Sequence, residues 1–110
     1  MKNCLLVSFY LAVVISATES LAAGKINYLD INGDTLTFST SEDKIGDILE
    51  CTYAESNHRW GISLSTNAGQ GIYSLLIAAK SNNLAISVES AGDCNDAPGL
   101  ERPKSVVISH

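Results

Sequence analysis

The residue types that most often do chemistry in proteins are scarce in this chain of 110 residues. Its two histidines are His58, in a predicted turn, and His110, at the C-terminus. No serine lies in a GxSxG motif, and the glycine patterns of phosphate-binding loops and dinucleotide-binding folds do not occur. A catalytic site needs a nucleophile, a base or metal ligands that converge. We therefore expect no catalytic residues, no metal ligands, no cofactor and no enzymatic activity.

The cysteines offer a different kind of chemistry. Cys4 lies in the apolar N-terminal segment, whereas Cys51 and Cys94 lie in the body of the chain. In an oxidising compartment an isolated pair most simply forms a disulfide, which at this loop length contributes roughly 4 kcal/mol on the chain-entropy model. The alternative, a redox or metal-binding pair, lacks CxxC spacing and a histidine cluster. We predict a Cys51–Cys94 disulfide.

A polar stretch after Cys51 is our candidate binding site. Tyr53, Asn57, His58 and Arg59 place an aromatic ring close to amide, imidazole and guanidinium groups. Such groups suit the hydroxyls of a sugar, and Arg59 can pair with an anionic sugar. We predict a glycan-binding site here. The alternative is an ordinary polar hairpin tip with a half-buried tyrosine.

The net charge limits the choice of partner. The chain has a formal net charge of -5 at pH 7. Nucleic acids and anionic membrane surfaces favour patches of Lys and Arg. The densest acidic cluster, Glu42, Asp43 and Asp47, lacks the spacing of a calcium-binding loop, so we interpret it as solvated surface. We expect no nucleic-acid partner.

The N-terminus has the pattern of an export signal. Lys2 is followed by the apolar run Leu5–Ile15 and then by the small residues Ser20, Ala22 and Ala23. The apolar run is too short to span a bilayer, which disfavours the alternative of a retained membrane anchor.

Two boundaries follow from this pattern. We expect residues 1–23 to be a signal peptide, with cleavage after Ala22 or Ala23, and residues 24–110 to form one OB-like domain. The protein would then be secreted or periplasmic, with no membrane insertion after cleavage.

Hydrophobic alternation places the strands that must position these residues. Lys25–Ile31 and Thr35–Thr40 flank Asn32-Gly33, a pair typical of two-residue hairpin turns. A second hairpin is predicted from Ile48–Ala54 and Arg59–Ser65.

A change of hydrophobic period then predicts the one helix, from about Ala68 to Lys80. Thr66 or Asn67 can supply the N-cap. Gly69 and Gly71 weaken the helix, so we expect them to allow close packing of its first turn against the sheet. Before the helix, alternation predicts a buried Trp60; an exposed ring that binds ligand is the alternative.

Two more strands follow the helix, one around Ile86 and one at Ser105–Ser109, separated by the loop Ser90–Lys104. This order predicts a mainly β domain with one helix, as a small OB-type Greek-key barrel. An open antiparallel sheet with one packed helix is the alternative.

The run CTYAESNHRWGISLSTNAGQGIYSLLIAAKSNNLAISVE, residues 51–89, resembles the central segment of B subunits of the subtilase-cytotoxin and pertussis-like AB5 toxins. The matching positions are Cys51, Trp60, Gly61, Ser63, Ser65, Thr66, Gln70 and Tyr73. The resemblance implies an OB barrel, secretion, and a ring of five subunits that binds cell-surface glycans and carries a catalytic subunit.

Two functional hypotheses follow. The first is a secreted or periplasmic, non-catalytic, B-subunit-like module that recognises a cell-surface glycan, forms a homopentamer and carries a toxin-like catalytic subunit. The second is a stand-alone structural or inhibitory protein that acts through a protein surface.

Overall fold

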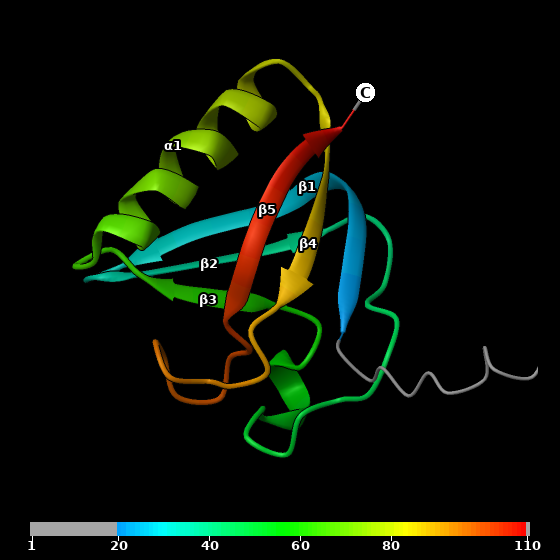
Figure 1. The fold of residues 1–110 in the computed structure, drawn as a ribbon, viewed down its shortest axis with the longest axis vertical. Helices are drawn as coiled ribbons and strands as arrows, with labels where there is room; N and C mark the ends of the chain where they lie inside the picture. Colours follow the sequence, from blue (N-terminus) through cyan, green and yellow to red (C-terminus); the bar gives the residue numbers. More distant parts are fainter. Residues whose placement is uncertain (1–19, 110) are drawn as a thin grey trace, which may run out of the picture.

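The computed structural model describes residues 20–109, which form a five-stranded sheet and one α-helix (Figure 1). The strands lie in the order β3-β2-β1-β4-β5, and all neighbouring strands are antiparallel. The elements are β1 (Leu21–Asn32), β2 (Thr35–Thr40), β3 (Trp60–Ser63), α1 (Asn67–Ser81), β4 (Ala85–Ser90) and β5 (Pro103–Ser109). The predicted class, mainly β with one helix, is confirmed in the open-sheet form that we considered as the alternative.

The two edges of the sheet approach each other, but they do not pair along their length as the predicted closed barrel would require. Trp60, at the start of β3, and Glu101, just before β5, form an isolated parallel bridge. The Gly61 amide donates to the Glu101 carbonyl oxygen at 3.0 Å. A side chain at Gly61 would meet Leu100, so the missing Cβ permits this approach. Within residues 20–109, the contact between these edges is a single bridge rather than a ladder.

The first predicted hairpin is confirmed, and β2 has the predicted bounds. Asn32 pairs with Thr35, so the two turn residues are Gly33 and Asp34. Gly33 has a φ of +65°, which glycine adopts without steric cost. The prediction that Asn32 itself belongs to the turn is therefore wrong, because Asn32 is the last residue of the ladder.

The second predicted hairpin is not formed. Residues 48–53 contain one isolated bridge, Thr52 with Gly99, and the 3-10 helix η2 (Ala54–Ser56) follows. The side chain of Ile48 is 66% exposed, so the apolar residues that suggested a strand do not share a buried face. β3 pairs instead with β2, with Phe38 opposite Trp60.

Helix α1 closely matches its prediction. The Thr66 hydroxyl caps it by accepting from the Gly69 amide at 2.9 Å. A Cβ on Gly69 would overlap the Ser63 carbonyl oxygen, so this glycine lets the first turn pack directly on the end of β3. Gly71 has no neighbour within 4 Å of such a Cβ, and the same role predicted for it is wrong.

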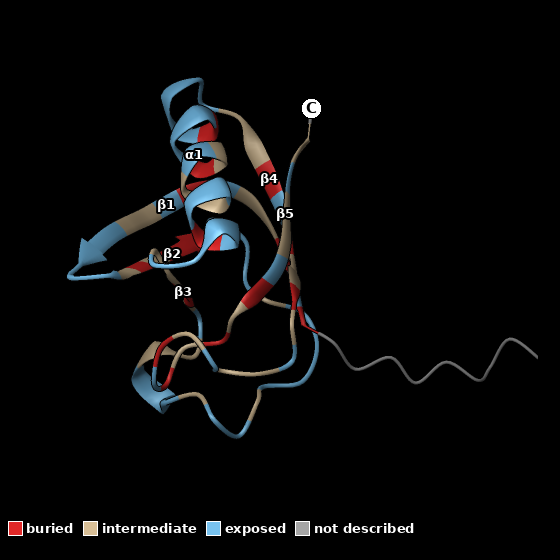
Figure 2. Cartoon of the chain, turned by 60° about the vertical axis from the view of Figure 1, so that its left-hand side comes forward, coloured by how far each residue is buried: buried red, intermediate tan, exposed pale blue. Residues whose placement is uncertain are grey.

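The core lies between the helix and the concave face of the sheet, where Figure 2 shows the buried positions of α1 and the strands. Trp60 is completely buried, as predicted, and its ring stacks near Phe38 with 6.5 Å between centroids. The predicted disulfide is present, and it joins Cys51 to Cys94 across the irregular part of the chain. None of the helices within residues 20–109 combines the length and apolar character needed to cross a membrane.

Strand β1 begins inside the segment that the sequence suggests is the end of an export signal. Leu21–Lys25 pair with β4, and Ala22 belongs to the buried core. Figure 1 shows β1 bending between this part and the part that pairs with β2. Residues 1–19 and 110 lie outside the described residues, so the predicted cleavage and the domain limits 24–110 stay predictions.

Candidate functional site

Residues 54–59, which we call the tip segment, lie between two hollows in the surface. The segment starts with η2 and leads into β3. It is held by backbone hydrogen bonds from the Ser56 amide to the Tyr53 carbonyl and from the Arg59 amide to the Ser56 carbonyl, both 3.0 Å. The Ser56 hydroxyl also donates to the Gly99 carbonyl at 3.2 Å. These bonds fix which side chains turn toward each hollow.

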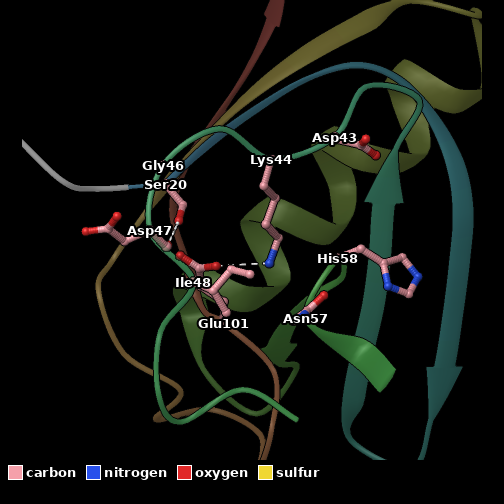
Figure 3. A pocket seen from close by; sticks show the side chains of 9 residues that line it. All are labelled: Ser20, Asp43, Lys44, Gly46, Asp47, Ile48, Asn57, His58 and Glu101. Atoms are coloured by element: carbon pink, nitrogen blue, oxygen red, sulfur yellow. Dashed lines mark hydrogen bonds and ion pairs between the residues drawn. The ribbon is translucent and has the colours of Figure 1, made fainter. Parts of the chain in front are cut away.

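The first hollow, which we call the inner cavity, has a volume of about 290 Å³ (Figure 3). Its lining comes from the residue before β1, the 43–48 loop, the tip segment and the loop that leads into β5: Ser20, Asp43, Lys44, Gly46, Asp47, Ile48, Asn57, His58 and Glu101. Figure 3 shows the side chains of Lys44 and Glu101 meeting, with a dashed line for their ion pair, whereas the imidazole of His58 is directed away from this pair.

Lys44 and Glu101 form a buried ion pair. Lys44 Nζ lies 2.9 Å from Glu101 Oε1 and also donates to the Arg59 carbonyl at 2.8 Å. The ammonium lies 4.2 Å from the centroid of the Trp60 ring, within cation–π range. Burial lowers the pKa of Lys44, because the charged form loses solvation, and the hydrogen bond and attraction to Glu101 oppose this effect.

Two buried polar atoms beside this ion pair have no hydrogen-bond partner among residues 20–109. Glu101 Oε2 is buried and has no hydrogen-bond partner among residues 20–109. The indole Nε1 of Trp60 is also buried without a partner in this part of the chain. Buried polar groups are normally satisfied, so these atoms lower the stability of the arrangement relative to a fully paired one.

The second hollow, which we call the Tyr28 groove, is a wider and more open depression of about 470 Å³. It lies over the outward face of β1 and β2, and its lining is Tyr28, Asp30, Asn32, Thr35, Thr37, Ser56, Arg59, Ala97, Pro98 and Leu100. Most of these side chains are hydroxyl, amide or charged groups. A shallow polar groove of this kind suits a ligand with many hydroxyls rather than an apolar one.

Arg59 is the one positively charged residue among those that line the Tyr28 groove. Its Cζ lies 3.9 Å from the centroid of the Tyr28 ring, so the guanidinium stacks on the aromatic face. No carboxylate lies within ion-pair distance of Arg59 among the described residues, where the two ion pairs are Lys44–Glu101 and Asp93–Arg102. The guanidinium is thus held in place by a ring while its charge has no acidic partner in residues 20–109.

The structure separates the four residues predicted to form one glycan site. Asn57 and His58 line the inner cavity, whereas Arg59 lines the Tyr28 groove. Tyr53 lines neither hollow; it is 53% exposed, and its ring covers Gly99. The predicted residues therefore do not converge, because the chain turns between His58 and Arg59 from the inner cavity to the Tyr28 groove.

Sequence reasoning missed the residues that surround Arg59 and the partner of Lys44. Tyr28 and Asp30 on β1, and Thr35 and Thr37 on β2, alternate with apolar residues and share the outward face of the first hairpin. That alternation was a usable signal, since period-2 spacing puts such residues on one face. No comparable signal pairs Lys44 with Glu101, which are 57 positions apart.

No group of three His, Cys, Asp or Glu side chains within residues 20–109 has an arrangement that could hold a metal ion. Comparison with known proteins gives no match: no family model, no curated protein and no solved structure is detectably similar to this chain. Any function must therefore be argued from the surface of the described residues.

Proposed function

We propose that this protein is an exported, non-catalytic binding module that recognises an anionic glycan in the Tyr28 groove. The observation that carries the proposal is Arg59, whose guanidinium is stacked 3.9 Å from the Tyr28 ring centroid and has no carboxylate partner in residues 20–109. A planar guanidinium can bind a carboxylate through two parallel hydrogen bonds. The carboxylate of an acidic sugar is a ligand of this shape.

The rest of the groove suits the neutral part of a sugar. Thr35, Thr37, Ser56 and Asn32 supply hydroxyl and amide groups that both donate and accept. Sugar hydroxyls need such mixed partners, because each can donate one hydrogen bond and accept others. Asp30, at the same surface, provides a further acceptor.

The experiment is calorimetric titration of the purified protein with a sialylated trisaccharide and with the same sugar lacking its acidic residue. We expect the acidic sugar to bind more tightly by about tenfold or more, equivalent to roughly 1.4 kcal/mol. Arg59→Gln should remove this preference. Lys104→Gln is the matched control, because it removes one positive charge from an exposed residue outside the groove.

Absence of binding to either sugar at high micromolar concentration would contradict the proposal. Equal loss of binding in Arg59→Gln and Lys104→Gln would also contradict it, because the effect would then come from net charge and not from the groove.

The proposed assembly is a homopentamer that carries a catalytic subunit, as the resemblance to toxin B subunits implies. β5 is an edge strand of the sheet, and its Val107 is 55% exposed, whereas the outer edge of β3 already donates from the Gly61 and Ser63 amides to Glu101 and Asp96. Edge strands present unpaired backbone groups that a second copy can cover. Light scattering of the purified protein tests this step, and a monomer at high concentration would contradict it.

One observation favours the second hypothesis, a stand-alone protein that acts through a protein surface. Leu21 and Ile45 are 50% and 72% exposed and form an isolated bridge side by side. Both line a hollow of about 240 Å³ next to Glu42 and Asp43. Exposed apolar residues with a polar rim are typical of protein contacts. A monomer that fails to bind sugars would make this the better account.

A further inference from the structure

The Tyr28 groove contains an acidic residue as well as a basic one. Asp30 is exposed and lines the groove together with Arg59. The two side chains form no ion pair with each other, and neither has an oppositely charged partner within residues 20–109. An acid in the groove opposes the binding of a purely anionic ligand, because like charges repel. The positions of these two charges therefore affect which acidic sugar the groove accepts.

The hairpin of β1 and β2 fixes where the negative charge lies. Tyr28, Asp30 and Asn32 alternate along β1, so their side chains project from the same face. Tyr28 and Asp30 are one pleat apart, which corresponds to about 7 Å along the strand. Arg59 lies just before β3 and reaches over β2 to stack on the Tyr28 ring. A positive group at Tyr28 is thus followed by a negative group one pleat further along β1.

Oxygen acceptors lie beside Asp30. Thr37 is directly opposite it on β2, and Asn32 is the next residue on the same face of β1. Side chains directly opposite in an antiparallel pair have Cβ atoms about 5 Å apart. An ammonium group has three N–H donors to satisfy. The Asp30 carboxylate, the Thr37 hydroxyl and the Asn32 amide oxygen can accept from them.

The opposite wall of the groove is apolar. Gly61 pairs with Thr37 on the side away from Asp30, and Leu100 occupies the space that a side chain at Gly61 would take. The residues that line this wall are Ala97, Pro98 and Leu100. Asp30 is therefore the one residue of the lining that can attract a cationic group by its charge.

We infer that the sugar bound in the Tyr28 groove is zwitterionic, with a protonated amine held at Asp30 in addition to the carboxylate held by Arg59. The inference rests on the proposed function, because it takes the acidic sugar as given and adds a second charge to it. Asp30 then determines specificity, since it favours a free amino sugar acid over the N-acylated form. Acylation removes the positive charge of the sugar and leaves the Asp30 carboxylate without a partner.

The test is calorimetric titration of the purified protein with the methyl glycosides of neuraminic acid and of N-acetylneuraminic acid, at slightly acidic pH. The two sugars have the same carboxylate, but only the first has an amine that can be protonated. We expect neuraminic acid to bind about fivefold more tightly, which is the upper range for an exposed ion pair.

Two variants assign this preference to one carboxylate. Asp30→Asn should remove the preference without weakening the binding of the N-acetylated sugar. Asp34→Asn is the matched control, because it removes the same charge from an exposed residue of the turn that does not line the groove. The control should keep the preference. An equal loss of preference in the two variants would overturn the inference, because the effect would then come from net charge.

The two sugars also separate this inference from the proposed function. Binding of the N-acetylated sugar with no gain from the free amine would overturn the inference and leave the proposed function standing. Binding of neither sugar at high micromolar concentration would contradict the proposed function, and the inference would fail with it.

Discussion

The Lys44–Glu101 and Asp93–Arg102 ion pairs have similar lengths, 2.9 and 2.7 Å, but opposite surroundings. The side chains of the first pair are 11% and 1% exposed, whereas those of Arg102 and Asp93 are 34% and 28% exposed. Breaking a buried pair leaves a charge that water cannot reach, whereas an exposed charge is solvated again. Burial, and not the distance between the charges, therefore decides how much each pair matters.

The two pairs also span different lengths of chain. Lys44 and Glu101 are 57 positions apart and connect the loop after β2 to the end of the loop before β5. Asp93 and Arg102 are nine positions apart and lie within the loop before β5, where the bidentate contact orders that loop locally. The first pair supports the packing of the sheet edges, and the second supports one loop.

The largest effect is expected for Trp60, the ring on which Lys44 lies. Trp60→Ala should lower the free energy of unfolding by about 3 to 5 kcal/mol, because it removes a completely buried aromatic side chain. Urea denaturation measures this change. Tyr53→Ala is the control, since its ring is half exposed and should matter much less. An unchanged midpoint for Trp60→Ala would contradict the buried position of the ring.

A somewhat smaller loss is expected when the buried pair is broken. Lys44→Met should lower the free energy of unfolding by about 3 kcal/mol, because the carboxylate of Glu101 then stays buried without its cation. Adding Glu101→Gln to Lys44→Met should recover part of the loss, since the stranded charge is removed. Urea denaturation of Lys44→Met, of Glu101→Gln and of the double variant completes a double-mutant cycle, which measures the coupling between the two charges. Additive effects would show that the two charges are not coupled.

The smallest effect is expected at the exposed pair, and it depends on pH. Asp93→Asn should lower the free energy of unfolding by no more than about 1 kcal/mol at neutral pH. The hydrogen bonds from Arg102 lower the pKa of Asp93 below its ordinary value of 3.8. The stabilisation is therefore complete above pH 3.8 and is lost as the pH falls through the lower pKa of the folded state.

Thermal unfolding of the wild type and of Asp93→Asn, at neutral pH and in acid, measures this difference. The two proteins should converge at the acid end. A difference in stability between the two proteins that grows as the pH falls would contradict the lowered pKa of Asp93.

Several elements could be predicted because their signals are local. Thr66 caps α1, and β2 has the bounds that the alternation of Leu36 and Phe38 indicates, since capping and period-2 spacing depend on neighbours in sequence. The burial of Trp60 followed from the same alternation. The Cys51–Cys94 bridge followed because these were the two cysteines beyond the predicted signal.

The wrong predictions concern segments whose structure depends on distant partners. Ile48–Ala54 has apolar residues that suggest a strand, but β2 takes β3 as its neighbour, and Ile48 stays exposed. The four residues of the predicted glycan site were grouped because they are close in sequence, and whether they bind a glycan stays a prediction. The tip segment instead directs Asn57 and Arg59 to different hollows.

The amino-acid sequence by itself determined the class of the fold, the helix with its cap and the first hairpin, because propensity and periodicity act over a few residues. It also determined the disulfide, because two cysteines lie beyond the predicted signal. The tertiary structure alone decided that Lys44 meets Glu101, that Arg59 stacks on Tyr28, and that Ser20 is enclosed between Asp47 and Ser90. The physical reason is that these contacts join segments far apart in the chain. They form only once the sheet has set the register of its strands, and neither side of such a contact carries a local signal of the other.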